Sequence, residues 1–153
     1  MSATVRVIGI GQPSAGDDGV GIAVAHALRT LRLPAGVEIH EIVDPASLVE
    51  LLDGIRRAIL IDAVVGDCAP GRLLCLTPEA LAGERLTPLS SHATSVVQGI
   101  QLARTLAPGS VAATIRLVGV TIEPPVSYTP HLSPAIRAAL PQAVALVRRL
   151  LDT

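Results

Sequence analysis

Residues 4–31 read TVRVIGIGQPSAGDDGVGIAVAHALRTL, in which a strand pattern, a glycine-rich loop and a helix pattern follow one another. The β-branched and apolar run over 4–10 predicts a buried strand. Apolar residues then recur at helical spacing from 20 to 31, which predicts a helix there. A strand that passes through a loop into a helix is typical of an α/β protein with a parallel sheet.

The rest of the chain continues this alternation of strand and helix patterns. We expect further strands at 37–43, 57–66, 72–78 and 113–122, and helices at 45–55, 93–106 and 135–151. The segment 79–91 is polar and irregular, and Pro141 is expected to kink the last helix or split it in two. This order predicts a single α/β domain over residues 1–153, a three-layer α/β/α sandwich with a mostly parallel central sheet of about five strands.

Composition limits the classes of partner. Half of the residues are hydrophobic and the formal net charge is −1, so the chain lacks the basic footprint that binds nucleic acid or an acidic membrane. No segment reaches the roughly 18 unbroken apolar residues of a membrane helix, and the first strand begins too early to leave room for a secretory leader. Cys68 and Cys75 have neither zinc-site nor disulfide-framework spacing, which suits a reducing compartment. We expect a soluble cytoplasmic protein, and nothing in the sequence demands more than a monomer.

Three places along the chain qualify for chemistry, because ligands of such sheets bind beyond the carboxyl ends of the strands. They are the loop 11–18 after the first strand, Asp62 at the end of the third, and the loop before the helix at 93. The predicted fold carries Asp18, Asp62 and His92 to one edge. Two carboxylates and an imidazole suit a divalent first-row metal, with positions left for water or substrate.

Each of these residues also has a plainer interpretation when it is taken alone. An Asp before a helix often caps it, but only one of Asp17 and Asp18 can occupy the cap position. Asp62 could simply start a loop, and a lone histidine such as His92 is more often a surface or packing residue. The three residues become a candidate site only together.

Two other kinds of site fit the sequence less well. A dinucleotide fingerprint needs glycine at the sixth position of GxGxxG, where this chain has Ser14, and the two Asp residues of the loop would repel a pyrophosphate. A serine hydrolase would need a GxSxG elbow, and Ser91 directly before His92 is not a triad arrangement. Of the remaining histidines, the best reserve ligand is His131, in a proline-rich loop, ahead of His26 and His40.

Five segments resemble the nickel-iron hydrogenase maturation endopeptidases. VIGIGQPSAGDDGVG is similar to the family's opening strand and its GxGN…D-D/E-GxG loop, and LIDAVVGDCAPG is similar to its D-A-x-x-x-G-x-x-P-G segment. SSHATSVVQGIQLA is similar to its S-x-H loop and following helix, and VGVTIEP with HLSPAIRAAL to its closing strand and helix. The resemblance covers almost the whole chain, with the segments in the family's order and spacing.

The resemblance implies a metal-dependent endopeptidase that removes a short C-terminal extension from the precursor of a nickel-iron hydrogenase large subunit after nickel has been installed. The family's catalytic, metal-contacting residues fall on Asp18, Asp62 and His92. Asp17 would be a cap or a supporting partner of that site. The nickel would be supplied by the substrate, and no nucleotide cofactor is implied.

The sequence departs from the family pattern at two places. Gln12, followed by Pro13, stands where the family has Asn, and VDPAS at 43–47 lacks the family's glycine, although Asp44 could still approach the site. Two alternatives therefore stay open at this point. One is a non-catalytic module of the same fold that recognises the nickel site or acts as a chaperone, and the other is a nucleotide-binding α/β domain.

Overall fold

Five strands form one sheet in the order β2-β1-β3-β5-β4 in the computed structural model, which describes residues 4–66, 69–83, 91–124 and 128–153. The strands are β1 (Val5–Ile10), β2 (Val37–Ile42), β3 (Arg57–Val64), β4 (Leu73–Leu76) and β5 (Thr114–Thr121). Strands β2, β1, β3 and β5 are parallel, and β4 runs antiparallel to β5 at the edge. The predicted five-stranded, mostly parallel sheet is confirmed.

Helices connect the strands in the predicted order. They are η1 (Gly16–Gly19), α1 (Val20–Arg29), η2 (Pro45–Ser47), α2 (Leu48–Leu51), α3 (Pro78–Gly83), α4 (Ser91–Leu106) and α5 (Pro134–Leu151). The segment expected to be irregular after residue 78 therefore begins with a helix. Thr77 accepts a hydrogen bond from the Ala80 N–H at 3.1 Å, and Leu81 is buried beneath the helix, so a cap and an apolar anchor hold α3.

Helix α5 continues through Pro141, so the expected split does not occur, whereas the alternative of a kink stays a prediction. Proline removes one hydrogen bond from a helix interior, and packing on both sides of it has to hold the helix together. The buried stripe of α5 extends across the proline, and its members are Ile136, Ala139, Ala143, Val147 and Leu151.

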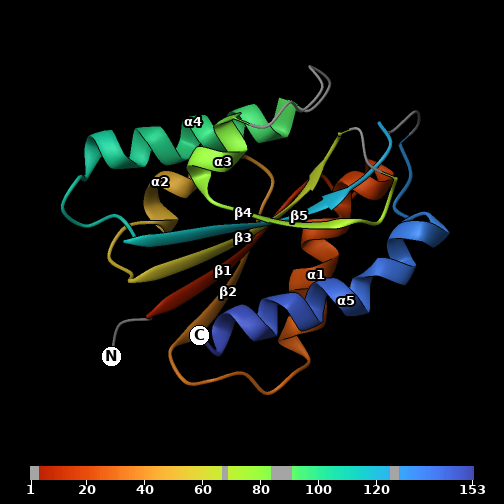
Figure 1. Cartoon of the computed structure of the whole chain (residues 1–153), viewed down its shortest axis with the longest axis horizontal. Helices are drawn as coiled ribbons and strands as arrows, with labels where there is room; N and C mark the ends of the chain where they lie inside the picture. Colours follow the sequence, from red (N-terminus) through yellow and green to blue (C-terminus); the bar gives the residue numbers. More distant parts are fainter. Residues whose placement is uncertain (1–3, 67–68, 84–90, 125–127) are drawn as a thin grey trace.

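The sheet is covered on both faces, as Figure 1 shows, with α1 and α5 on one side and α2, α3 and α4 on the other. Val5 and Val7 of β1 belong to the core under α1 and α5, whereas Ile8 and Ile10 belong to the core under α2 and α4. Strands of a sheet buried on both faces carry near-continuous apolar runs, which is the pattern that predicted this sandwich. No helix in the described ranges is long and apolar enough to cross a bilayer.

The two ends of the parallel strands have different neighbours. At the amino ends, Arg57 of β3 donates hydrogen bonds to the carbonyl oxygens of Leu150 and Thr153, at 3.2 and 2.8 Å, so the chain's C-terminus lies there. At the carboxyl ends, helices α4 and α5 begin (Figure 1). Every predicted site residue comes from segments at this second edge.

Candidate functional site

Asp18 lies in η1, directly after the loop that follows β1, and its side chain is buried, with 7% exposed. Its Oδ2 atom accepts a hydrogen bond from the backbone N–H of Gln12 at 3.2 Å, so the loop curls back over its own beginning. A Cβ atom at Gly11 would overlap the carbonyl oxygen of Asp18, and only glycine permits this approach. Because Gln12 uses its backbone, the departure from Asn at that position leaves this contact in place.

Asp62 lies near the end of β3 and is almost fully buried, with 1% exposed. Side chains alternate along a strand, so Asp62 shares the face of Leu60, which packs in the core beneath α4. Its Oδ1 atom accepts a hydrogen bond from the Ala63 N–H at 2.8 Å. The residue in register with it on β5 is Gly119, which places no side chain beside the carboxylate.

The start of α1 brings Asp18 toward the end of β3. A Cβ atom at Gly21 would overlap the carbonyl oxygens of both Ile10 and Ile61, so the helix backbone rests directly on β1 and β3. Ile61 directly precedes Asp62, and Asp18 lies three residues before Gly21. The short helix η1, which contains Asp18, packs against β3. The buried carboxylates of Asp18 and Asp62 therefore lie at the same edge of the sheet, on two elements that pack against each other.

His92 is the second residue of α4, and its side chain lies outside the part of the chain that the structure describes. Helix α4 begins at the edge where β1 and β3 end (Figure 1). Among the described side chains, no three of His, Cys, Asp and Glu gather closely enough to hold a metal ion, and that set does not include the imidazole of His92. Convergence of Asp18, Asp62 and His92 stays a prediction.

Asp17 has a role that the sequence did not reveal. It lies inside η1, whose N-cap is Ala15, and the N-cap of α1 is Gly19, so Asp17 is the N-cap of neither helix. Its Oδ1 atom instead accepts the backbone N–H of Ser133 at 2.6 Å, and its Oδ2 atom accepts the Ser133 hydroxyl at 2.8 Å. Ser133 is the N-cap residue of α5, so Asp17 ties the acidic loop to the last helix.

The segment 128–133 runs along the same loop. Thr129 forms a parallel bridge with Ala15 and accepts the Gly16 N–H at 2.7 Å through its carbonyl oxygen. His131, the reserve ligand, is exposed, and its backbone N–H donates to the Thr129 hydroxyl at 3.3 Å. One sequence signal marks this segment, the Ser-Pro pair at 133–134, which is typical of a helix start.

Thr121 anchors the segment that follows Asp62. Its hydroxyl is buried and donates to the carbonyl oxygen of Ala69 at 2.6 Å, while it accepts the N–H of Arg72 at 2.8 Å. The carbonyl oxygen of Thr121 accepts the N–H of Gly71 at 2.7 Å. One side chain of β5 therefore holds residues 69–72 against the sheet. Cys68, just before them, lies outside the described residues.

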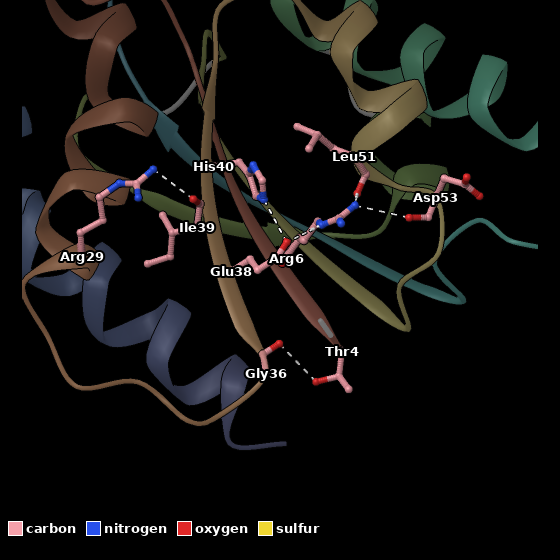
Figure 2. A network of polar contacts seen from close by, with 9 residues as sticks. All are labelled: Thr4, Arg6, Arg29, Gly36, Glu38, Ile39, His40, Leu51 and Asp53. Carbon is pink, nitrogen blue, oxygen red and sulfur yellow. Dashed lines mark hydrogen bonds and ion pairs between the residues drawn. The ribbon is translucent and has the colours of Figure 1, made fainter. Parts of the chain in front are cut away.

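The other predicted residues have local partners. Asp44 is exposed and caps η2 through a 2.9 Å bond from the Ala46 N–H. His26 lies 2.6 Å from a carboxylate oxygen of Glu41. His40 lies 3.1 Å from Glu38, in the network around β2 that Figure 2 shows. These contacts account for His26 and His40 without a metal.

Comparison with known proteins gives consistent similarities. A family model described as hydrogenase maturation protease matches residues 23–150. Protein FrxA of Pyrococcus furiosus is 31% identical over 134 residues, which cover 86% of this chain and 93% of that protein.

Solved structures with the same fold include the hydrogenase maturating endopeptidase HybD from Escherichia coli. It has a TM-score of 0.82 and 24% identity, and the match covers 99% of this chain and 93% of that one. The NiFe hydrogenase maturation protease HybD from Thermococcus kodakarensis has a TM-score of 0.73 and 20% identity, with 99% of each chain covered. The three-layer fold predicted from the sequence is therefore confirmed.

Proposed function

The chain belongs to the hydrogenase maturation protease family, and from this membership we propose that it removes a C-terminal extension from the nickel-loaded large-subunit precursor of a NiFe hydrogenase. The observation that carries the proposal is the pair of buried carboxylates, Asp18 and Asp62, at the edge of the sheet where α/β proteins bind ligands. The family match includes Asp62 and His92 but begins after Asp18, so the place of Asp18 rests on its burial beside β3.

We infer that Asp18, Asp62 and His92 contact the nickel ion of the substrate. Burial raises the free energy of an ionised carboxylate, and two carboxylates near one another also repel. A divalent cation presented at this edge would offset both costs. Carboxylate oxygens and an imidazole nitrogen are suitable donors for nickel, so the residues fit the ion.

This arrangement explains why the nickel site would be inspected before cleavage. A loaded precursor would bring a divalent charge to the two acidic side chains, whereas a precursor without nickel would not. The ion can act as a Lewis acid on the scissile carbonyl or lower the pKa of a bound water. The protein's own residues orient the nickel site and, because both acids are buried, limit the access of bulk water.

We infer that residues 1–153 act as one maturation-protease domain, as a monomer in the cytoplasm and without nucleic acid or membrane partners. Cys75 is an exposed free thiol, and exposed thiols persist in a reducing compartment.

The test uses nickel-loaded precursor and mass spectrometry of its C-terminus. The wild-type protein should release the tail, and Asp18→Asn, Asp62→Asn and His92→Ala should each lower the rate at least about 100-fold, the scale on which loss of an electrostatic catalytic group acts. Asp53→Asn, at an exposed carboxylate near the amino ends of the strands, is the matched control and should cleave normally. Circular dichroism should show that every variant is folded.

Two outcomes would contradict parts of the proposal. A variant that processes the precursor at the normal rate removes that residue from the mechanism. Binding of the loaded precursor by the wild-type protein without any loss of mass would instead favour the non-catalytic recognition or chaperone module.

A further inference from the structure

Tyr128 is the most exposed large apolar side chain in the described part of the chain, with 87% of its surface accessible. It is also the only aromatic residue of the sequence, which contains one Tyr, no Phe and no Trp. The other exposed large hydrophobic residues among the described ones are Leu31, Val43, Leu102 and Leu106. The chain therefore displays its one aromatic side chain on the surface instead of in a core.

The backbone fixes where Tyr128 stands relative to the candidate site. The next residue, Thr129, accepts the 2.7 Å hydrogen bond from Gly16, two residues before Asp18. Asp17 and Ser133 hold the other end of the same segment. Tyr128 is thus placed at the rim of the loop that carries Asp18.

Val43 takes the corresponding position at the beginning of this loop. Its side chain is 51% exposed, and the residue before it, Ile42, accepts a 3.1 Å hydrogen bond from the N–H of Gly11. The first residue of the loop, Gly11, is therefore bonded to Ile42, which precedes Val43. Further along the loop, Gly16 is bonded to Thr129, which follows Tyr128. Two exposed apolar side chains flank the segment that supplies one of the two buried acids.

We propose that Tyr128 and Val43 are contact residues for the polypeptide of the hydrogenase large-subunit precursor, one near each end of the Asp18 loop. The inference rests on the proposed function. It assigns residues that bind the polypeptide of the substrate, whereas Asp18, Asp62 and His92 would contact its nickel ion. The occupant is a segment of the precursor next to its scissile bond, because the flanked loop is part of the candidate site. Its apolar side chains would cover Tyr128 and Val43.

Physical chemistry favours these two residues as anchors. Tyrosine presents a large apolar ring with few rotatable bonds, so ordering it on binding costs little entropy, and it is enriched among residues that dominate binding free energy. A valine is already stiff at χ1 and adds apolar area without much further ordering. Contacts to non-reacting groups of a substrate that are equally strong in the ground state and the transition state lower KM and leave kcat unchanged.

The test is steady-state cleavage of nickel-loaded precursor, with binding of the precursor measured in parallel. We expect Tyr128→Ala to raise KM and the Kd for the precursor about tenfold, the effect of truncating an interface anchor, with kcat changed less than about twofold. Tyr128→Phe keeps the ring and should stay close to wild type. Val43→Ser should raise KM by about threefold.

Leu106→Ser is the matched control, because Leu106 is 64% exposed at the last residue of α4, at the far end of that helix from the candidate site. Its KM and Kd should equal those of the wild type. Unchanged KM and Kd in Tyr128→Ala, or a fall in kcat alone, would overturn the inference. If the wild-type protein binds the precursor but does not cleave it, the proposed function fails while the Kd values still decide whether Tyr128 and Val43 bind the substrate.

Discussion

Asp17 and Ser133 are 116 positions apart, and the Asp17 carboxylate accepts two hydrogen bonds from this one residue, at 2.6 and 2.8 Å. The Ser133 hydroxyl makes no capping bond to its own helix and turns to the acidic loop instead. A carboxylate at the start of a helix also interacts favourably with the positive end of the helix dipole. The contact joins the segments that carry Asp18 and Tyr128 into one rim.

The Asp17–Ser133 contact should stabilise the protein measurably. Asp17→Asn removes the charge, and Ser133→Ala removes the hydroxyl donor. We expect each to lower the free energy of unfolding by about 1–2 kcal/mol, the range for hydrogen bonds to a charged group in a half-buried position. Urea denaturation followed by circular dichroism measures the change.

The double variant separates this contact from unrelated effects. If the two side chains act as a pair, the double variant should lose less stability than the sum of the single losses. Additive losses would show that each residue acts independently. Asp53→Asn, an exposed carboxylate elsewhere, should leave stability within about 0.5 kcal/mol of wild type.

Local patterns were enough to predict the sandwich and the placement of the two acids. The alternation of strand and helix sets the parallel sheet, and parallel strands bring their carboxyl ends to one edge. Asp18 and Asp62 therefore had to lie at that edge, and the structure buries both there. Convergence with His92 depends on a side chain outside the described residues and remains a prediction.

Contacts between distant segments could not be predicted from the sequence. Ser133 forms hydrogen bonds with a residue 116 positions away, and Thr121 forms them with residues about 50 positions away. No rule of sequence spacing links such partners. The helix at 78–83 was missed because its apolar anchor is a single residue, Leu81, too little for a periodic pattern. The glycines of the first loop partly match a nucleotide fingerprint, but in the structure Gly11 permits close packing of the loop on Asp18.

Gly21 should tolerate no side chain. Alanine usually stabilises a helix interior relative to glycine by about 1 kcal/mol, but here the added Cβ would overlap the carbonyl oxygens of Ile10 and Ile61. We expect Gly21→Ala to lower the free energy of unfolding by about 2 kcal/mol, because backbone on both sides has to move. Denaturant titration measures this change, and the cleavage rate should fall because Asp18 moves with the helix.

Gly109→Ala is the control for that substitution, since nothing lies within 4 Å of a Cβ atom at Gly109. Its stability should equal or slightly exceed that of wild type, because alanine restricts the unfolded chain. Equal changes in the free energy of unfolding of Gly21→Ala and Gly109→Ala would show that the close approach at Gly21 does not cause the destabilisation.

Glu38 should make the stability of the protein depend on acid pH. The hydrogen bond from Arg6, and then that from His40, lower the pKa of this carboxyl group below its usual 4.5 (Figure 2). A depressed pKa in the folded state means that the contribution is complete above pH 4.5 and is lost as the pH falls through the lowered value. Wild type should therefore be more stable than Glu38→Gln at pH 7, with the difference shrinking as the pH falls below 4.5, as thermal unfolding can measure.

Arg6→Gln gives the contrasting result for this network. Arg6 also donates to the carbonyl oxygens of Leu51 and Asp53, at 3.1 and 3.4 Å, and those acceptors do not titrate. Its loss should destabilise the protein at pH 3 as well as at pH 7. A Glu38→Gln difference that stays constant as the pH falls below 4.5 would mean that the carboxylate charge is not its cause.

Thr121 should link the stability of the segment 69–72 to cleavage. Thr121→Val keeps the shape of the side chain but removes the hydroxyl, leaving the carbonyl oxygen of Ala69 and the N–H of Arg72 without this partner. We expect a loss of about 1–3 kcal/mol in the free energy of unfolding. We also expect a lower cleavage rate, since this segment follows the strand that carries Asp62.

Thr121→Ser restores the hydroxyl at the cost of one methyl group, about 1 kcal/mol, and should recover the cleavage rate. If valine and serine impair cleavage equally, the hydroxyl is not the group that holds the segment in place.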